Sequence, residues 1–278
     1  MTESKNINAF SQYEDAFLIL INNYKLTIPP SGARGLFVRG LFVRGLLMNY
    51  KTVFIDLDDT LWDFHANAKS SLQEIYEERN LGQYFDSFDQ YFNLYAKRNL
   101  ELWEMYGKGT ISKEALSLER FQHPLIQVGI DNASLAKEIG EQYLGLLPTR
   151  TMLMPFAKEL LDYLFPKYPL TIVSNGFVEV QYKKLHSCHI EQYFAHIVLS
   201  EAAEALKPDK RIFEYAMRLN NATAAETIMI GDSYEADIKG AQNAGIDQIY
   251  YNPRIYAAEI NKPATYWVKS LEKIMELI

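Results

Sequence analysis

The chain has 278 residues, of which 48% are hydrophobic, and its 28 basic and 35 acidic side chains give a formal net charge of −7. This length suits one large domain or two small ones, and the hydrophobic fraction is enough for a substantial core. The acidic balance argues against a nucleic-acid polymer as partner, although a local basic pocket could still hold a phosphate. The single cysteine, Cys188, excludes an intrachain disulfide and indicates a reducing cytoplasm. No apolar run reaches the length of a membrane span.

Residues 1–47 differ from everything that follows them. The apolar run at residues 16–21 is short and no small-residue cleavage site clearly follows it, which argues against a signal peptide. The sequence GLFVR at residues 35–39 is repeated at once at residues 40–44, and its glycines and arginines make a poor spanning helix. This leader could be an arm that binds a membrane surface or a partner. We favour a weakly packed extension without a chemical role, with the working protein beginning at Met48.

The first strong strand signal is the apolar run at residues 52–55, which ends in acidic residues. Asp56 and Asp58 are two residues apart, so their side chains point the same way while the backbone stays extended. Two such carboxylates repel each other unless a cation lies between them, and ligands of α/β folds bind at this end of the strands. One carboxylate could attack phosphorus and form an aspartyl-phosphate, with Mg²⁺ allowing the two anions to approach. The alternative is an acidic turn that caps the next helix. His65, close behind, is a further candidate, although a lone histidine is more often structural.

Residues 66–147 have a different pattern of apolar and polar residues. Apolar residues recur there at helical spacing and strand signals are scarce, which predicts a helical insert after the first strand. A break at residues 107–112, with a serine at its end, indicates a new helix N-terminus. The aromatic residues of the insert are typical of a core of its own, although Trp103 or Tyr106 could face a cleft.

From Pro148 onward, predicted strands and helices alternate. We expect strands at residues 170–174, 196–200, 227–230 and 246–251, and helices at residues 156–165, 177–187, 211–219 and 236–244. This rhythm implies a parallel sheet with right-handed crossovers and helices on both faces. The predicted fold class is therefore α/β, with a Rossmann-like core formed by residues 48–65 and 148–278 and an α-helical cap inserted at residues 66–147.

Polar residues follow two of the later strands. Ser174, Asn175 and Gly176 end the second strand, where a hydroxyl and backbone N–H groups can hold phosphate oxygens. The same three residues also make a good turn. Lys207 precedes a helix, and its ammonium group could neutralise a phosphate together with the attacking carboxylate. It could equally be an exposed lysine beside a helix-starting proline.

The strand at residues 227–230 leads into a further acidic segment. Asp232 is placed to bind a metal, since Mg²⁺ takes few protein carboxylates and keeps several waters. Asp237 could bind the ion directly or orient its ligands, although either acid could instead cap the helix that follows. All four polar features fall at the C-terminal ends of separate predicted strands or in the loops beyond them. That coincidence favours a single site.

These motifs resemble those of the haloacid dehalogenase superfamily of phosphohydrolases over about residues 50–253. The matching positions, in chain order, are Asp56, Asp58, Ser174, Lys207, Gly231, Asp232 and Asp237. The helical insert is similar to the type 1 cap of that superfamily. Residues 58–63 (DDTLWD), 109–116 (GTISKEAL) and 251–253 (YNP) resemble the pyrimidine nucleotidases of the YjjG type.

The resemblance implies a role for each matching residue. Asp56 would be the nucleophile, and Asp58 would protonate the leaving alkoxide and then activate water as a base. Lys207 would offset negative charge. The phosphoryl oxygens would be held by Ser174 and the nearby amides of Asn175 and Gly176. The implied ligands of Mg²⁺ are Asp56, the main-chain carbonyl of Asp58, Asp232 and, in support, Asp237.

The resemblance implies an Mg²⁺-dependent phosphomonoester hydrolase with a nucleoside 5′-monophosphate, and a pyrimidine one in particular, as substrate. The alternatives are a phosphatase of phosphoglycolate or sugar phosphates, a phosphotransferase like β-phosphoglucomutase, or an inactive binding module with the same fold. Asp58 argues against a dehalogenase, which would not need the second acid. No cap lysine has a context that points to the Schiff base of a phosphonatase. We expect a small phosphorylated metabolite as partner and a cytoplasmic location, while the sequence leaves the oligomeric state open.

Overall fold

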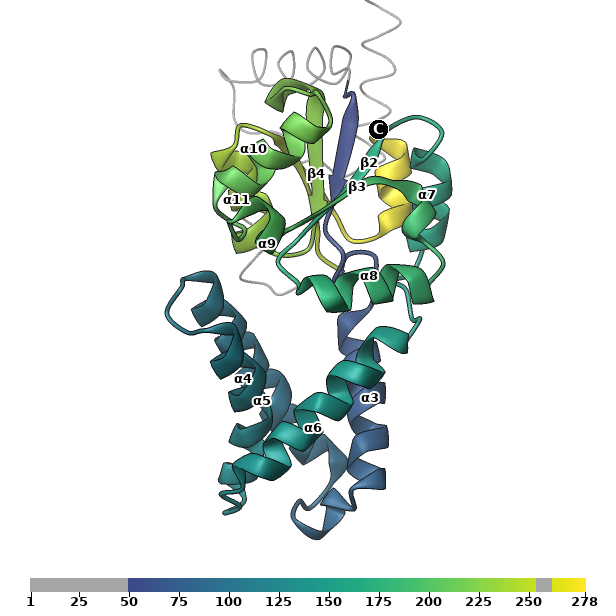
Figure 1. The fold of residues 1–278 in the computed structure, drawn as a ribbon. Helices are drawn as coiled ribbons and strands as arrows, with labels where there is room; N and C mark the ends of the chain where they lie inside the picture. Colours follow the sequence, from purple (N-terminus) through teal and green to yellow (C-terminus); the bar gives the residue numbers. More distant parts are fainter. Residues whose placement is uncertain (1–49, 254–261) are drawn as a thin grey trace, which may run out of the picture. The chain divides into compact units, whose positions relative to one another are not determined.

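The sheet at the centre of the fold has six parallel strands in the residues that this computed structural model describes, 50–253 and 262–278 (Figure 1). The leader expected at residues 1–47 lies outside them. In chain order the strands are β1 (Thr52–Ile55), β2 (Leu170–Ser174), β3 (Phe194–Leu199), β4 (Thr227–Gly231), β5 (Asp247–Tyr251) and β6 (Tyr266–Val268). They lie in the order β3-β2-β1-β4-β5-β6, so the winding of the chain reverses between β1 and β4. Ligands of open parallel sheets bind at such a switch point.

The central strands are buried along their whole length. Every residue of β1, β2 and β4 is inaccessible or nearly so, as expected for apolar runs covered on both faces of a parallel sheet. In β1, Ile55 lies opposite Ile172 of β2 and Ile230 of β4. Because the three strands are in register and parallel, the residues that follow each of them emerge at the same edge of the sheet.

Helices cover the sheet between successive strands. They are α7 (Ala157–Leu164), α8 (Val178–Ser187), the short α9 (Ser200–Ala203), α10 (Lys210–Leu219), a π-helical turn η5 (Tyr234–Ile238) and α11 (Lys239–Asn243). The 3₁₀ turns are η1 (Leu81–Gln83), η2 (Leu147–Thr149), η3 (Glu191–Tyr193), η4 (Ala224–Glu226) and η7 (Leu271–Glu276). Figure 1 shows α10 and α11 on one side of the sheet and α7 on the other.

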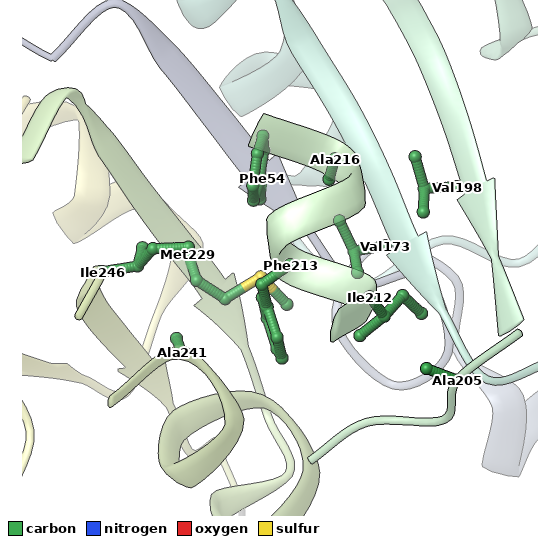
Figure 2. Close-up of a cluster of buried hydrophobic side chains, with 10 residues drawn as sticks. All are labelled: Phe54, Val173, Val198, Ala205, Ile212, Phe213, Ala216, Met229, Ala241 and Ile246. Carbon is green, nitrogen blue, oxygen red and sulfur yellow. The ribbon is translucent and has the colours of Figure 1, made fainter. Parts of the chain in front are cut away.

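A cluster of buried apolar side chains joins α10 and α11 to the sheet (Figure 2). Phe213 of α10 is fully buried there, together with Phe54 of β1 and Met229 of β4. Burying one such side chain contributes roughly 1.5–3 kcal/mol. Gly240 lets the two helices approach, because a Cβ at that position would lie 2.6 Å from the Phe213 ring. This packing holds the loops at the end of β4 in place.

Four helices make up the insert between β1 and β2. They are α3 (Phe64–Glu78), α4 (Phe88–Gly107), α5 (Lys113–Gln127) and α6 (Ala133–Leu146). Each begins at a side chain that accepts a hydrogen bond from the first turn, namely Asp63, Ser87, Ser112 and Asn132. The N-terminus indicated near residue 112 is therefore where the sequence placed it.

The insert has an aromatic core of its own. The Tyr95 and Phe121 rings stack with centroids 5.5 Å apart, and the Tyr143 ring meets Phe121 edge-on at 5.2 Å. The Tyr95 hydroxyl also hydrogen bonds the Tyr143 hydroxyl at 2.9 Å. The fold class is thus confirmed as a Rossmann-like parallel core with a helical cap.

Three details differ from the expected elements. The strand expected at residues 196–200 begins at Phe194, and Ser200 already starts α9. The helix expected at residues 236–244 is a π-helical turn that passes into the short α11. The edge strand β6 and the turn η7 are absent from the sequence prediction, since a three-residue strand offers too little pattern. Among the helices of residues 50–253 and 262–278, none combines the length and the apolar character that crossing a membrane requires.

Candidate active site

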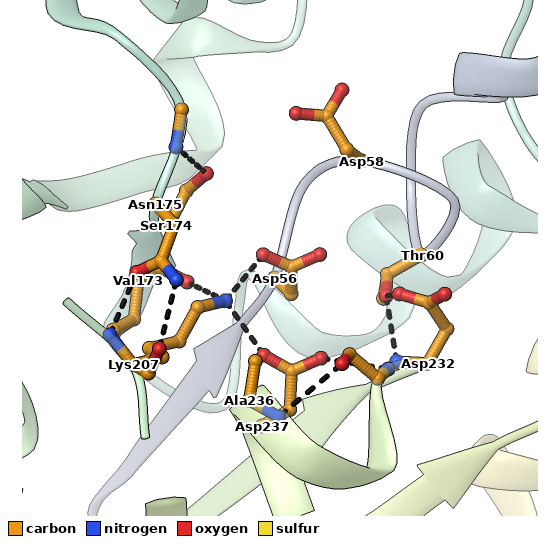
Figure 3. Close-up of polar contacts among 12 residues, drawn as sticks. Asp56, Asp58, Thr60, Val173, Ser174, Asn175, Lys207, Asp232, Ala236 and Asp237 are labelled. Atoms are coloured by element: carbon orange, nitrogen blue, oxygen red, sulfur yellow. Dashed lines mark hydrogen bonds and ion pairs between the residues drawn. The ribbon is translucent and has the colours of Figure 1, made fainter. Parts of the chain in front are cut away.

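The acidic residues after β1 and β4 meet at the C-terminal edge of the sheet (Figure 3). Asp56 directly follows β1, and its backbone N–H donates to the carbonyl of Ile230 at 2.9 Å. Asp232 follows β4, and Asp237 lies in the π-helical turn beyond it. One carboxylate oxygen from each of these three aspartates lies within 4.8 Å of the others.

Lys207 sits at the centre of this group and is 3% exposed. Its Nζ donates to Asp56 Oδ1 at 2.5 Å, to Asp237 Oδ1 at 2.6 Å and to the carbonyl of Val173 at 2.7 Å. All three donor positions of the ammonium group are therefore used. The alternative of an exposed lysine beside a proline is wrong.

Asn175 holds the Lys207 loop against β2. Its Nδ2 donates to the carbonyl of Lys207 at 2.9 Å, and its Oδ1 accepts from the Lys207 backbone N–H at 2.7 Å. The side chain of Asn175 is thus committed to positioning the lysine. In this structure it does not point a free group at a phosphate.

Burial sets the protonation of the site. It raises the pKa of Asp56 to about 7, against the opposing effect of Lys207. Burial, with Asp56 and Asp237 nearby, also holds the pKa of Asp232 well above its ordinary value. Burial alone would lower the pKa of Lys207, but Asp237 and Asp56 outweigh it and the net shift is upward. The site therefore gathers more negative charge than one ammonium group offsets.

This donor set fits a hard divalent cation. Three carboxylates against one ammonium leave a net charge of about −2 when all are ionised, and oxygen ligands suit Mg²⁺. Asp237 is the one of the three whose carboxylate oxygens both already accept hydrogen bonds. Its Oδ1 accepts from Lys207 and its Oδ2 accepts from the backbone N–H of Ser233 at 2.9 Å. Asp56 and Asp232 are therefore better placed as direct ligands, with Asp237 in support.

Gly231 and Thr60 shape the Asp232 side of the site. A Cβ at Gly231 would lie 2.4 Å from the Asp237 carboxylate, so only glycine fits there. Thr60 is fully buried; its Oγ1 donates to Asp232 Oδ1 at 3.1 Å and accepts from the Asp232 backbone N–H at 3.1 Å. The sequence prediction missed this role for Thr60, whose only signal was its place in the acidic turn after β1.

The Asp58 side chain lies apart from the three clustered carboxylates (Figure 3). Its Oδ1 accepts from Lys184 Nζ at 2.6 Å and its Oδ2 accepts from Gln181 Nε2 at 2.9 Å. Both partners are buried and belong to α8, three residues apart, so they share one face of that helix. The sequence prediction missed both, because a lysine and a glutamine in an amphipathic helix read as surface residues.

Ser174 ends β2 beside these groups and is 2% exposed. Its Oγ accepts from Gln181 Nε2 at 2.7 Å and from the backbone N–H of Gly176 at 3.1 Å. The hydroxyl hydrogen stays available to a ligand, whereas the N–H of Gly176 is already used. A Cβ at Gly176 would lie 2.2 Å from Gln181, which explains the glycine.

A cavity of about 570 Å³ extends from the clustered aspartates to the cap helices. This volume is typical of small-molecule sites. His65 lines it, with its ring edge-on to Phe92 at 5.2 Å, and it makes no contact with the clustered acids in the described residues. Trp103 lines it too and packs on Phe177 at 5.3 Å, whereas Tyr106 packs on the same ring from outside the lining.

The fold and the site together define a hydrolase of the haloacid dehalogenase type. The family model for haloacid dehalogenase-like hydrolases matches residues 50–245, so the chain belongs to that family. It is 30% identical to the pyrimidine 5′-nucleotidase PynA of Streptococcus pneumoniae, over 83% of this chain and 96% of that protein. It is 26% identical to the pyrimidine 5′-nucleotidase YjjG of Escherichia coli, over 83% of this chain and 99% of that one.

A solved structure agrees with this assignment. The magnesium-bound crystal structure of the HAD-hydrolase YfnB from Bacillus subtilis matches with a TM-score of 0.74 and 29% identity. The match covers 82% of this chain and 98% of that one. The resemblance drawn from the sequence, to this superfamily and its pyrimidine nucleotidases, is therefore confirmed.

Proposed function

We propose that the protein is an Mg²⁺-dependent phosphomonoester hydrolase that acts through an aspartyl-phosphate on Asp56. The observation that carries the proposal is that Asp56, Asp232 and Lys207 lie together at the C-terminal end of β1. A carboxylate that opens onto a cavity, beside an ammonium group and a second carboxylate, can receive a phosphoryl group. The solved relative bound to magnesium supports the choice of ion.

In the first step a carboxylate oxygen of Asp56 attacks phosphorus. The Oδ1 of Asp56 is held by Lys207, which fixes the direction of the carboxylate. The bond from phosphorus to the ester oxygen breaks, and Asp58 gives its proton to that oxygen. Asp56 now carries the phosphoryl group and the alcohol leaves.

In the second step water replaces Asp56 on phosphorus. Asp58, now ionised, removes a proton from the water, which attacks phosphorus and releases inorganic phosphate. Both aspartates return to their starting forms. Lys184 and Gln181 hold Asp58 in place for both proton transfers.

Mg²⁺ would be held by Asp56, the main-chain carbonyl of Asp58 and Asp232, with Asp237 in support. When bound, it would shield the carboxylates from the phosphate and stabilise the negative charge of the transferred group. Lys207 remains as the second positive charge and touches both Asp56 and Asp237. The hydroxyl of Ser174 would donate to a phosphoryl oxygen.

We further propose a nucleoside 5′-monophosphate, and a pyrimidine one, as substrate. The support is the pair of relatives named as pyrimidine 5′-nucleotidases, each matched over almost its whole length. Residues 66–147 would act as the cap over the substrate and exclude water during transfer. A cytoplasmic location, inferred from the lone Cys188, belongs to the same proposal.

A panel of phosphomonoesters, assayed for phosphate release with Mg²⁺ and with a chelator, tests this proposal. We expect turnover that needs the ion, faster for pyrimidine nucleotides than for sugar phosphates or phosphoglycolate. Asp56→Asn should lose detectable turnover, whereas Asp131→Asn, at an exposed cap position, should keep it. Activity that survives the chelator would remove the metal assignment, and activity that survives Asp56→Asn would remove the aspartyl-phosphate.

A further inference from the structure

The cap end of the cavity contains a buried arginine with free donors. Arg120 of α5 lines the cavity and is 3% exposed. Its Nε and one Nη have no hydrogen-bond partner in the residues that the structure describes. Its guanidinium carbon lies 4.9 Å from the Phe121 ring centroid and 5.5 Å from the Tyr143 ring centroid, and the Tyr95 hydroxyl is a polar neighbour of the same group. A buried cation with unused donors is costly, so its position indicates a ligand that brings acceptors.

Asn99 of α4 provides the complementary group. It lines the same cavity and is 6% exposed, and its Oδ1 accepts no hydrogen bond from any described residue. Tyr95, Asn99 and Trp103 are spaced by four residues along α4, so they share one face. All three line the cavity. The unused acceptor of Asn99 and the unused donors of Arg120 therefore belong to residues that line one cavity together with aromatic side chains.

The donors and the acceptor together restrict the ligand. A guanidinium only donates, so it needs an acceptor atom, such as a carbonyl, carboxylate, phosphate or hydroxyl oxygen or a ring nitrogen. Oδ1 of Asn99 only accepts, so it needs an N–H or O–H group. An ionised carboxylate satisfies the first and not the second. A pyrimidine ring satisfies both, because its O2 accepts while uracil N3–H or the cytosine amino group donates. A flat ring also suits walls of Tyr95 and Trp103.

We propose that Arg120 and Asn99 form the base-binding subsite of this enzyme and select a pyrimidine ring. The inference rests on the proposed function, which places the phosphate of the same substrate at Asp56. Arg120 donates a hydrogen bond to a ring carbonyl, and Asn99 Oδ1 accepts one from the neighbouring N–H group of the ring. These two residues bind the part of the substrate that does not react, so they determine specificity.

The test compares a nucleotide with a sugar phosphate that has a hydroxyl in place of the base. Uridine 5′-monophosphate and ribose 5-phosphate are assayed with the wild type, Arg120→Met and Asn99→Leu. We expect kcat/KM for the nucleotide to fall by about tenfold or more in each variant, since a lost partner leaves a buried polar group unpaired. For ribose 5-phosphate it should stay within about twofold, because that substrate never contacts the subsite.

Arg98→Met is the matched control. Arg98 precedes Asn99 on α4 and pairs with Glu101 at 3.0 Å and Glu119 at 2.8 Å, and it does not line the cavity. It should leave both substrates unchanged. Arg120→Lys keeps the positive charge but not the planar set of N–H donors. Its kcat/KM for the nucleotide should therefore fall less than that of Arg120→Met. Thermal unfolding of every variant identifies any that has lost its fold.

Equal losses for the two substrates would overturn the inference, since Arg120 would then serve only the structure of the cap. An unchanged rate with the nucleotide in both variants would overturn it too.

If the wild type hydrolyses neither substrate, calorimetric titration with uridine 5′-monophosphate decides whether the subsite binds the base. Binding that Arg120→Met abolishes would keep the subsite while the proposed function fails. Turnover of simple phosphomonoesters without any effect of Arg120 would keep the function while the subsite fails. Faster turnover of adenosine 5′-monophosphate would contradict the pyrimidine choice.

Discussion

Asp58 shows how single residues decide the chemistry of the site. It has the proton-transfer role in the proposed mechanism, yet its side chain is held by α8 rather than by the clustered carboxylates. Lys184, the nearer partner, is 3% exposed and its Nζ lies 4.3 Å from the Trp62 ring centroid. We therefore regard Lys184 as a positioning residue for the general acid.

Replacing Lys184 should matter most when the leaving group needs a proton. We expect Lys184→Met to lower kcat for an alkyl phosphate by about tenfold to a hundredfold, part of what a general acid supplies. p-Nitrophenyl phosphate should lose much less, because nitrophenolate leaves without a proton. Lys183→Met, at the exposed neighbouring position, is the control. An equal loss for both substrates would mean that Lys184 only stabilises the fold.

The shifted pKa of Asp56 predicts how the metal-free protein responds to pH. Its pKa is about 7 in the folded protein against an ordinary 3.8, mainly through burial. Between these values the folded state binds a proton that the unfolded state has released, so stability falls as pH rises. Above the folded pKa this loss is complete.

Mg²⁺ should restore the stability that the folded protein loses when these carboxyl groups ionise. We expect the rise in Tm on adding Mg²⁺ to be larger at about pH 7.5 than at about pH 5.5, where protons compete with the ion. Thermal unfolding in chelator and in Mg²⁺ at both pH values measures this difference. Asp232→Asn should shrink it strongly. A gain that does not depend on pH would contradict the assignment of these carboxylates as ligands.

At the scale of elements, the close contact of α10 and α11 positions the end of β4. A Cβ at Gly240 would lie 2.6 Å from the Phe213 ring and 3.0 Å from the Pro208 Cα. Because backbone cannot move aside easily, Gly240→Ala should reduce the free energy of unfolding by about 1–3 kcal/mol. Urea unfolding measures this change.

Gly145 of α6 offers the matched comparison. A Cβ there meets nothing within 4 Å, so Gly145→Ala should be neutral or should stabilise by up to about 1 kcal/mol through helix propensity. If the two substitutions have the same effect, close packing at Gly240 is not what fixes α11. The comparison separates a packing cost from a general effect of removing glycine.

At the scale of the whole molecule, Lys113 connects the cap to the core. Its Nζ lies 3.0 Å from Glu179 of α8, 3.2 Å from Glu201 of α9 and 4.1 Å from the Phe177 ring centroid. This one residue of α5 thus contacts two elements of the core beside the cavity. A half-exposed ion pair of this kind contributes about 0–1 kcal/mol.

Loss of this link should weaken substrate binding slightly. We expect Lys113→Met to raise KM by up to about fivefold at low salt, with the difference shrinking as salt screens the pairs. Lys137→Met is the control, since Lys137 pairs with Glu141 within α6 alone at 3.8 Å. A KM that rises equally in both variants would remove any role of the link. KM measured across ionic strength provides the comparison.

Both the sheet and the acids at its edge could be predicted from the residues alone. Short apolar runs rich in β-branched residues that alternate with helical segments favour buried parallel strands, and the residues that end such strands share one edge of the sheet. For that reason Asp56, Asp232 and Lys207 could be brought to one site before any coordinates. The cap helices followed equally directly from their periodicity and from Ser112 as an N-cap.

The further polar side chains of that site could not be predicted, because they reach it through packing between distant segments. Lys184 and Gln181 look like surface residues of an amphipathic helix until α8 packs against the loop of Asp58. Arg120 and Asn99 belong to different helices and meet the same cavity only because the cap folds around it. Local pattern records burial and periodicity, whereas pairing between distant segments depends on packing that no short stretch of sequence contains.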